Sequence, residues 1–173
     1  GFKRHFGATF LQLARQRRVQ MGLRAMSTGD KLIDAQLTAG FSSPSAFRLA
    51  FAQLMGQAPG SLKRDAVLKA GCIDTPLGPM LAVADAKVLH LLEFIDRRAL
   101  RGELARLRSR TGAEVGMGHS EPMAQVEAEL VEYFDGKKAQ FAVALAEHGS
   151  SFERAVWADL RAIPAGQTRS YGA

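Results

Sequence analysis

Cysteine is almost absent from this sequence, and that excludes several classes of protein. The 173 residues include one cysteine, Cys72, so no internal disulfide can form and the chain fits a reducing compartment. No apolar run approaches the ~20 residues that span a bilayer, and the opening residues lack a signal-peptide pattern. Phosphate-cradling glycine loops are also missing. Disulfide scaffolds, membrane-spanning proteins and the common nucleotide-binding folds are therefore not indicated.

Patterns for metal binding and for nucleophilic catalysis are equally sparse. The four histidines, His5, His90, His119 and His148, are scattered without ligand-like spacing, so we expect no metal and no cofactor. Cys72 has no adjacent histidine or basic residue and no helix N-terminus to lower the pKa of its thiol. We expect it to be a small packing residue. The sequence therefore assigns no catalytic residue.

What the sequence does have is a basic excess confined to its first third. Residues 1–65 hold ten Lys or Arg against three Asp, a net charge of +7, whereas residues 66–173 hold thirteen bases against fourteen acids. This asymmetry is typical of a segment that binds a polyanion. With 47% apolar residues the chain can bury a core, and the change of texture near residue 65 predicts at least two domains.

A helix-turn-helix pattern lies between residues 31 and 64. Apolar residues from Leu32 to Leu37 have the spacing of a short helix. Gly40 can supply the left-handed backbone of a tight turn, and Phe41 can fill the space beneath it. Such patterns also occur in ordinary all-α cores, so periodicity alone does not establish DNA binding. The charge of the segment favours it.

The second helix of this pattern has a small, polar and cationic outer face. Ser42 or Ser43 can cap the helix, and Gly56 with Pro59 can end it. Its large apolar residues share one buried stripe: Phe47, Phe51 and Leu54. Three of the remaining side chains are assigned as contacts to a DNA major groove: Ser43, Ser45 and Arg48.

The same pattern recurs earlier in the chain. Phe2 and Gly7 have the spacing of Phe51 and Gly56, forty-nine residues later. We therefore expect residues 2–6 to end a first recognition helix, and residues 10–26 to form a long helix that links two helix-turn-helix units. The chain begins without Met in a periodic segment and stops where a helix would open, so both ends are expected to be cut.

With these features the first 65 residues resemble the AraC-type DNA-binding domain, which carries two helix-turn-helix motifs joined by a long helix. The matching residues include Ala39-Gly40-Phe41, Phe47, Phe51, Gly56 and Pro59. The resemblance implies binding to duplex promoter DNA, and two further matching residues join the assigned contacts: Arg18 and Arg64. Two positions depart from the family, since Gln36 replaces a small residue and Leu49 a basic one. A DNA contact at that second position is lost or supplied by Arg48.

Residues 66–149 have a different texture. Three β-rich runs, at 67–72, 79–83 and 88–94, predict a three-stranded antiparallel meander. Amphipathic helices are expected at 96–110 and 123–134, with a loop at 112–122 between them, and residues 140–145 can return as a strand. The basic face of the first helix is expected to be solvated. The acidic face of the second helix is also expected to be solvated and not to bind a metal ion. It consists of Glu127, Glu129 and Glu132.

The last stretch predicts a helix from about residue 152 to Pro164. From the residue pattern alone, this is a core helix whose single tryptophan has a structural role. Its order of residues nevertheless resembles the start of the C-terminal domain of O6-alkylguanine-DNA alkyltransferases. The matching residues are Phe152, Val156-Trp157, Leu160-Arg161, Ile163-Pro164, Gly166, Thr168 and Ser170-Tyr171-Gly172. The segment before it is similar to the ribonuclease-H-like N-terminal domain of that family.

Together the resemblances give the domain order of Ada-type regulators of the adaptive response to alkylation. They imply a multidomain α and α+β chain. Residues 1–65 would form an all-α AraC-type double helix-turn-helix, and residues 66–149 a ribonuclease-H-like α/β domain. Residues 150–173 would form the truncated start of a helical, winged-helix-like alkyltransferase domain.

The Ada resemblance also implies an activity for the parent protein. Family members flip the alkylated guanine out of the duplex and move its alkyl group irreversibly to a cysteine. Only Tyr171 matches a working position, beside the phosphate of the flipped nucleotide, whereas Cys72 does not match the nucleophile. We therefore expect a fragment that binds promoter and alkylated DNA without transferring a methyl group. The fragment would act as a monomer in the bacterial cytoplasm, at the nucleoid and not at a membrane. The parent can also contact RNA polymerase.

Two alternatives stay open at this point. A plain transcriptional regulator would use the middle domain to sense a small ligand. An alkyltransferase-like protein with its cysteine replaced would bind lesions without chemistry. The repair hypothesis requires a Cys-His pair in the parent, beyond Ala173. Its presence there would distinguish repair from both alternatives.

Overall fold

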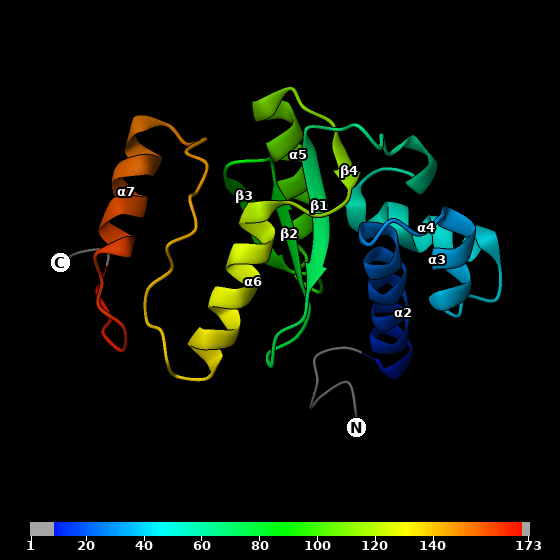
Figure 1. The fold of residues 1–173 in the computed structure, drawn as a ribbon, viewed down its shortest axis with the longest axis horizontal. Coiled ribbons are helices and arrows are strands. Elements are labelled where there is room, and N and C mark those ends of the chain that lie inside the picture. Colours follow the sequence, from blue (N-terminus) through cyan, green and yellow to red (C-terminus); the bar gives the residue numbers. More distant parts are fainter. Residues whose placement is uncertain (1–8, 171–173) are drawn as a thin grey trace.

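The structure is a computed structural model that describes residues 9–170 (Figure 1). A helical N-terminal region precedes a small mixed α/β domain with a four-stranded sheet, and one further helix follows. This layout confirms the predicted order of a helical and an α/β region. The recognition helix expected at residues 2–6 and the assigned contact Tyr171 lie outside the described residues. Within residues 9–170 no helix is long and apolar enough to cross a membrane.

The described part of the N-terminal region has three helices: α2 (Phe10–Ser27), α3 (Leu32–Thr38) and α4 (Pro44–Met55). The turn between α3 and α4 uses Gly40, whose φ of 64° is the left-handed conformation expected there. Ser43 caps α4, because its hydroxyl accepts a hydrogen bond from the Ala46 N–H at 3.2 Å. Gly56 ends α4 with φ 72°, and a short 3-10 turn, η1 (Pro59–Ser61), follows. The predicted helix-turn-helix is confirmed.

Three strands form the predicted antiparallel meander: β1 (Leu68–Ile73), β2 (Met80–Ala84) and β3 (Leu89–Phe94). The sheet order is β3-β2-β1-β4, and β4 (Val115–Met117) pairs parallel to β1. The prediction that residues 112–122 form a loop is therefore wrong at residues 115–117, which form β4. Residues 140–145 contribute only an isolated bridge, between Leu89 and Leu145.

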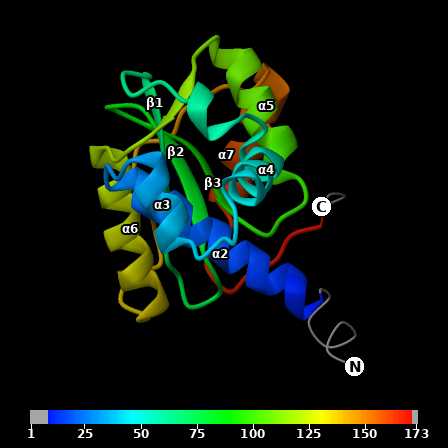
Figure 2. The same cartoon turned by 90° about the vertical axis from the view of Figure 1, so that its right-hand side faces the viewer.

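Alternation along the strands gives the sheet two buried faces. On β2, Leu81 and Val83 belong to one apolar cluster, whereas Ala82 and Ala84 belong to another. Helix α6 (Glu121–Phe134) packs on the second face. Helix α5 and the helix-turn-helix pack against the first face, and Figure 2 shows α5 and α6 on opposite sides of the sheet.

The helix-turn-helix and the sheet share one hydrophobic core. Phe51 and Met55 of α4 and Leu23 of α2 lie in the same buried cluster as Leu81 of β2. Leu104 of α5 (Leu100–Thr111) belongs to this cluster as well. Helix α4 is thus packed into the core of the neighbouring sheet domain rather than tethered to it.

Polar contacts cross the same boundary. The Arg108 guanidinium of α5 donates to the Met55 carbonyl at the end of α4, at 3.1 Å. The Gln57 side chain donates to the Val115 carbonyl of β4, also at 3.1 Å. Arg24 of α2 pairs with Asp74, just beyond β1. Together with the shared core, these contacts fix the orientation of α4 relative to the sheet.

Helix α7 (Ser151–Arg161) lies at the opposite end of the molecule from the helix-turn-helix (Figure 1). A capping box formed by Ser150 and Glu153 begins it, and Glu153 also pairs with Arg110 of α5 at 3.3 Å. None of its residues is buried, and the Phe152 side chain is 76% exposed. The predicted helix is confirmed, but its apolar side lies outside the core.

Candidate DNA interface and polar network

The outward side of α4 presents two of the side chains predicted to read DNA. Ser45 and Arg48 are both exposed. Neither has a hydrogen-bond or ion-pair partner among residues 9–170, so both are available to a ligand. Ser43 differs, because its half-buried hydroxyl already caps α4. Leu49 is 56% exposed on the same helix, where an apolar side chain can contact a thymine methyl group.

The other predicted contacts come from different elements. Arg18 is exposed on α2, and Arg64 is exposed just beyond η1. No ion pair within the described part of the chain joins Arg18, Arg64 or Arg48 to an acid. Exposed, unpaired arginines of this kind suit contacts to phosphates, which position a protein on duplex DNA.

Glu129 of α6 contradicts the prediction of a solvated acidic face. It is 5% exposed, and its carboxylate accepts from the backbone N–H groups of Ala142 and Val143 at 2.9 and 3.2 Å. Lys138 pairs with it at 3.3 Å. Burial raises the pKa of Glu129, but the hydrogen bonds it accepts, which include one from Gln125, outweigh burial and lower the pKa. Glu129 therefore ties the segment after α6 to the sheet domain.

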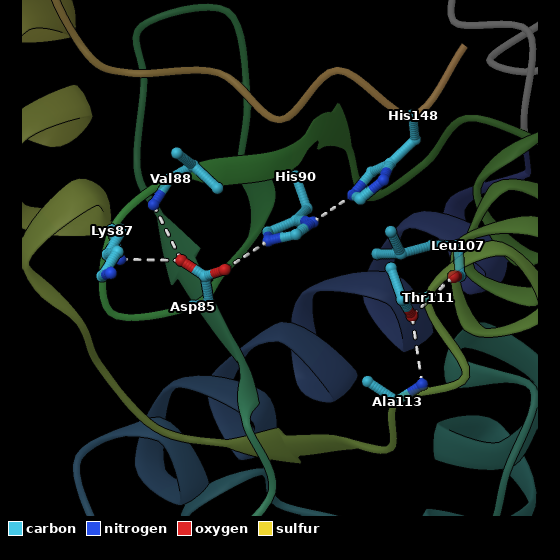
Figure 3. A network of polar contacts seen from close by, with 8 residues as sticks. All are labelled: Asp85, Lys87, Val88, His90, Leu107, Thr111, Ala113 and His148. Carbon is cyan, nitrogen blue, oxygen red and sulfur yellow. Dashed lines mark hydrogen bonds and ion pairs between the residues drawn. The ribbon is translucent and has the colours of Figure 1, made fainter. Parts of the chain in front are cut away.

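Two histidines predicted to be scattered meet in the fold (Figure 3). His90 Nδ1 lies 2.6 Å from His148 Nε2, and the two ring centroids are 4.7 Å apart. His90 Nε2 lies 3.0 Å from the Asp85 carboxylate. The three side chains form a line that joins the β2–β3 turn, β3 and the segment before α7. Within residues 9–170 no group of three His, Cys, Asp or Glu can hold a metal ion.

The line of polar groups keeps Asp85 charged. Burial raises the pKa of Asp85, but hydrogen bonds from His90 and from the N–H groups of Lys87 and Val88 outweigh it and hold the pKa at about 2. Burial also lowers the pKa of His148, and the nearby His90 and Arg110 lower it further. His148 is therefore neutral at pH 7.

The lowered pKa of His148 predicts a pH dependence of stability. The unfolded chain binds a proton there near the ordinary pKa of 6.5, whereas the folded chain binds it only at lower pH. The free energy of unfolding should therefore fall as the pH drops below about 6.5. His148→Gln should remove this part of the slope, and His119→Gln, at an exposed histidine, should keep it. Thermal unfolding between about pH 7.5 and about pH 5.5 measures both slopes; equal slopes contradict the prediction.

Cys72 packs against the shared core, as predicted from its apolar surroundings. Burial raises the pKa of its thiol to about 12, with a further rise from Asp74 and an opposing effect of Arg24. The thiol is therefore protonated at neutral pH, and only the thiolate is a good nucleophile.

Two family models match the chain along its length. A helix-turn-helix domain model matches residues 1–65. The ribonuclease-like domain of 6-O-methylguanine DNA methyltransferase matches residues 68–146. Over these two segments the chain is therefore similar first to a helix-turn-helix domain and then to the ribonuclease-like domain of a methyltransferase. This combination is consistent with an Ada-type fusion.

The curated relatives of the chain are methylated-DNA–protein-cysteine methyltransferases. That of Mycobacterium leprae is 32% identical over 100 residues, which cover 58% of this chain and 54% of the relative. That of Salmonella typhimurium is 33% identical over 102 residues, with 58% and 59% covered. The chain thus spans a little over half the length of these relatives. The solved structure of the Mycobacterium tuberculosis O6-methylguanine methyltransferase is 30% identical, with a TM-score of 0.48 over 61% of this chain and 58% of that one.

Proposed function

We propose that this chain is part of an Ada-type protein that binds duplex DNA through its AraC-type domain and repairs O6-alkylguanine in the intact parent. The observation that best supports the proposal is that the two domains occur in one chain and share one hydrophobic core. A basic helix-turn-helix with an unobstructed outer face is built into the same core as a methyltransferase ribonuclease-like domain. DNA recognition and DNA repair therefore belong to one molecule, which we assign to the bacterial nucleoid.

We assign residues 1–65 to the AraC-type domain, 66–149 to the ribonuclease-like domain and 150–173 to the opening of the catalytic domain. The exposure of α7 supports the last assignment. Phe152 and Leu160 are 76% and 49% exposed, and large apolar side chains left exposed on one helix are typical of a surface that another segment covers. The high pKa of Cys72 supports a nucleophile elsewhere in the parent, so residues 1–173 should transfer no methyl group.

Duplex DNA with a labelled O6-methylguanine tests the repair activity. The intact parent should take up one methyl group per molecule and then stop, because the acceptor cysteine is not regenerated. Residues 1–173 alone should take up none. If the parent takes up no label, the repair activity is excluded. The remaining hypotheses are then a DNA-binding regulator and a protein that binds lesions without chemistry.

Arg48 is expected to read a base edge, so its loss should weaken sequence discrimination. Arg48→Ala should reduce the preference for a selected duplex over a scrambled one by about 1–3 kcal/mol. Arg18→Ala is the matched control, because the loss of a phosphate contact weakens both duplexes equally. Competition binding with duplexes selected by the wild-type chain measures the ratio. An unchanged ratio in Arg48→Ala would remove Arg48 from the reading face.

A further inference from the structure

Arg101 of α5 lies at the end of the recognition helix, although it belongs to the methyltransferase domain. A Cβ placed on Gly56, the C-cap of α4, would lie 3.7 Å from Arg101 Cγ. The hydrogen bond from Arg108 to the Met55 carbonyl holds α5 against this end of α4. The sequence predicted only a solvated basic face for α5, but the fold places part of that face beside the proposed DNA-reading helix.

The position of Gly56 continues the outward stripe of α4. Gly56 follows Ser45 by eleven residues, which is about three turns, so the two lie within about 20° of each other around the helix axis. A twelve-residue helix such as α4 is about 18 Å long, and the major groove is about 12 Å wide. A group at the end of α4 therefore reaches past the base edges towards the flanking phosphates.

Three of the arginines on and just before α5 have acid partners: Arg97 with Glu93 at 2.6 Å, Arg106 with Glu103 at 4.0 Å and Arg110 with Glu153 at 3.3 Å. Arg108 instead donates to the Met55 carbonyl, and Arg98, like Arg101, has no ion-pair partner among residues 9–170. Arg101 is exposed, and no carboxylate in the described part of the chain lies within ion-pair distance of it. Its guanidinium is therefore free for an anionic ligand.

We propose that Arg101 is a phosphate contact that the ribonuclease-like domain adds to the DNA interface of the AraC-type domain. This inference rests on the proposed DNA binding. The shared core makes the contact effective, because α4 and α5 are packed as one body and Arg101 keeps a fixed place beside the groove. The planar guanidinium forms charge-assisted hydrogen bonds to phosphate oxygens and loses less freedom for each of them than an ammonium group does.

Three variants of the 173-residue chain test the inference: Arg101→Ala, Arg101→Lys and, as the control, Arg106→Ala. Arg106 is exposed on the same helix but lies about 140° around its axis from Arg101. The probe is a fluorescein-labelled random-sequence duplex of about 30 base pairs, titrated between about 50 and 200 mM salt. Arg101→Ala should bind roughly 5–10-fold more weakly near 0.1 M salt, with a salt slope smaller by about 1. Arg101→Lys should restore both, and Arg106→Ala should match the wild type.

The outcomes separate the two proposals. Equal binding by Arg101→Ala, Arg106→Ala and the wild type overturns the Arg101 contact and leaves the DNA-binding domain in place. A loss that Arg101→Lys fails to restore also overturns it, because lysine supplies the same charge. A wild-type chain without salt-dependent binding overturns the proposed DNA binding itself. Arg101→Glu is a second variant, in which the reversed charge should weaken binding further than alanine does.

Discussion

Replacement of Phe51 by alanine is expected to destabilise the helix-turn-helix region and the sheet domain together, by about 3–5 kcal/mol. The ring of Phe51 is completely buried in the cluster that also contains Leu81 and Leu104. Its removal leaves a cavity at the boundary of the two domains, and the well-packed sheet can fill that cavity only in part. The loss is a large share of the 5–15 kcal/mol that typically stabilises a domain.

Hydrogen exchange measures this effect in both domains at once. In Phe51→Ala the amides of β1 and β2 should lose as much protection as those of α4, because a shared core unfolds cooperatively. Leu49→Ala is the control on the same helix, since Leu49 is 56% exposed and its loss should cost less than about 0.5 kcal/mol. A sheet that keeps its protection while α4 loses it would show that the two domains unfold separately.

Glu129→Ala is expected to cost a similar amount, about 3–5 kcal/mol, for an electrostatic reason. The substitution removes the acceptor for two backbone N–H groups, those of Ala142 and Val143, and leaves Lys138 without its buried partner. A buried donor without an acceptor costs more than a hydrogen bond contributes. Glu129→Gln keeps one oxygen acceptor and should cost less than alanine.

Urea unfolding measures the Glu129 effect against Glu132→Ala. Glu132 lies on the same helix with a 54% exposed side chain, and its contact with Lys138 is longer, at 3.6 Å. The lowered pKa of Glu129 adds a pH signature. Its stabilisation should be complete above the ordinary pKa of 4.5 and should fade as the pH falls below it. Equal stability of the two alanine variants would contradict the buried role of Glu129.

The elements found from the sequence are those whose signals are local. Gly40 and Gly56 adopt the left-handed conformations that their positions in the pattern require. The meander strands were predictable because their alternation and turn residues lie within a few positions of each other. In the predicted α4 stripe, Phe47 and Phe51 are buried, and Leu54 is half-buried against the same core.

The features missed depend on partners far apart in the chain. β4 has only three residues, one of them Gly116, and becomes a strand because α5 returns the chain beside β1. Glu129 looked like its acidic neighbours, since its amide partners follow 13 and 14 residues later. His90 and His148 are 58 residues apart. Arg101 lies beside α4 only because the two domains pack in a fixed orientation. Hydrophobic periodicity in the sequence does not reveal that orientation.

The bridge at Leu89 has a consequence for the protein in solution. β3 is a border strand, and its Leu89 N–H donates to the Ala144 carbonyl at 2.8 Å while the Ala146 N–H donates to the Leu89 carbonyl at 2.9 Å. An uncovered border strand is a template on which another chain can pair. The segment that Glu129 anchors thus covers the first residue of this border strand and limits pairing with another chain there. Variants that release this segment should lose solubility before they lose the fold.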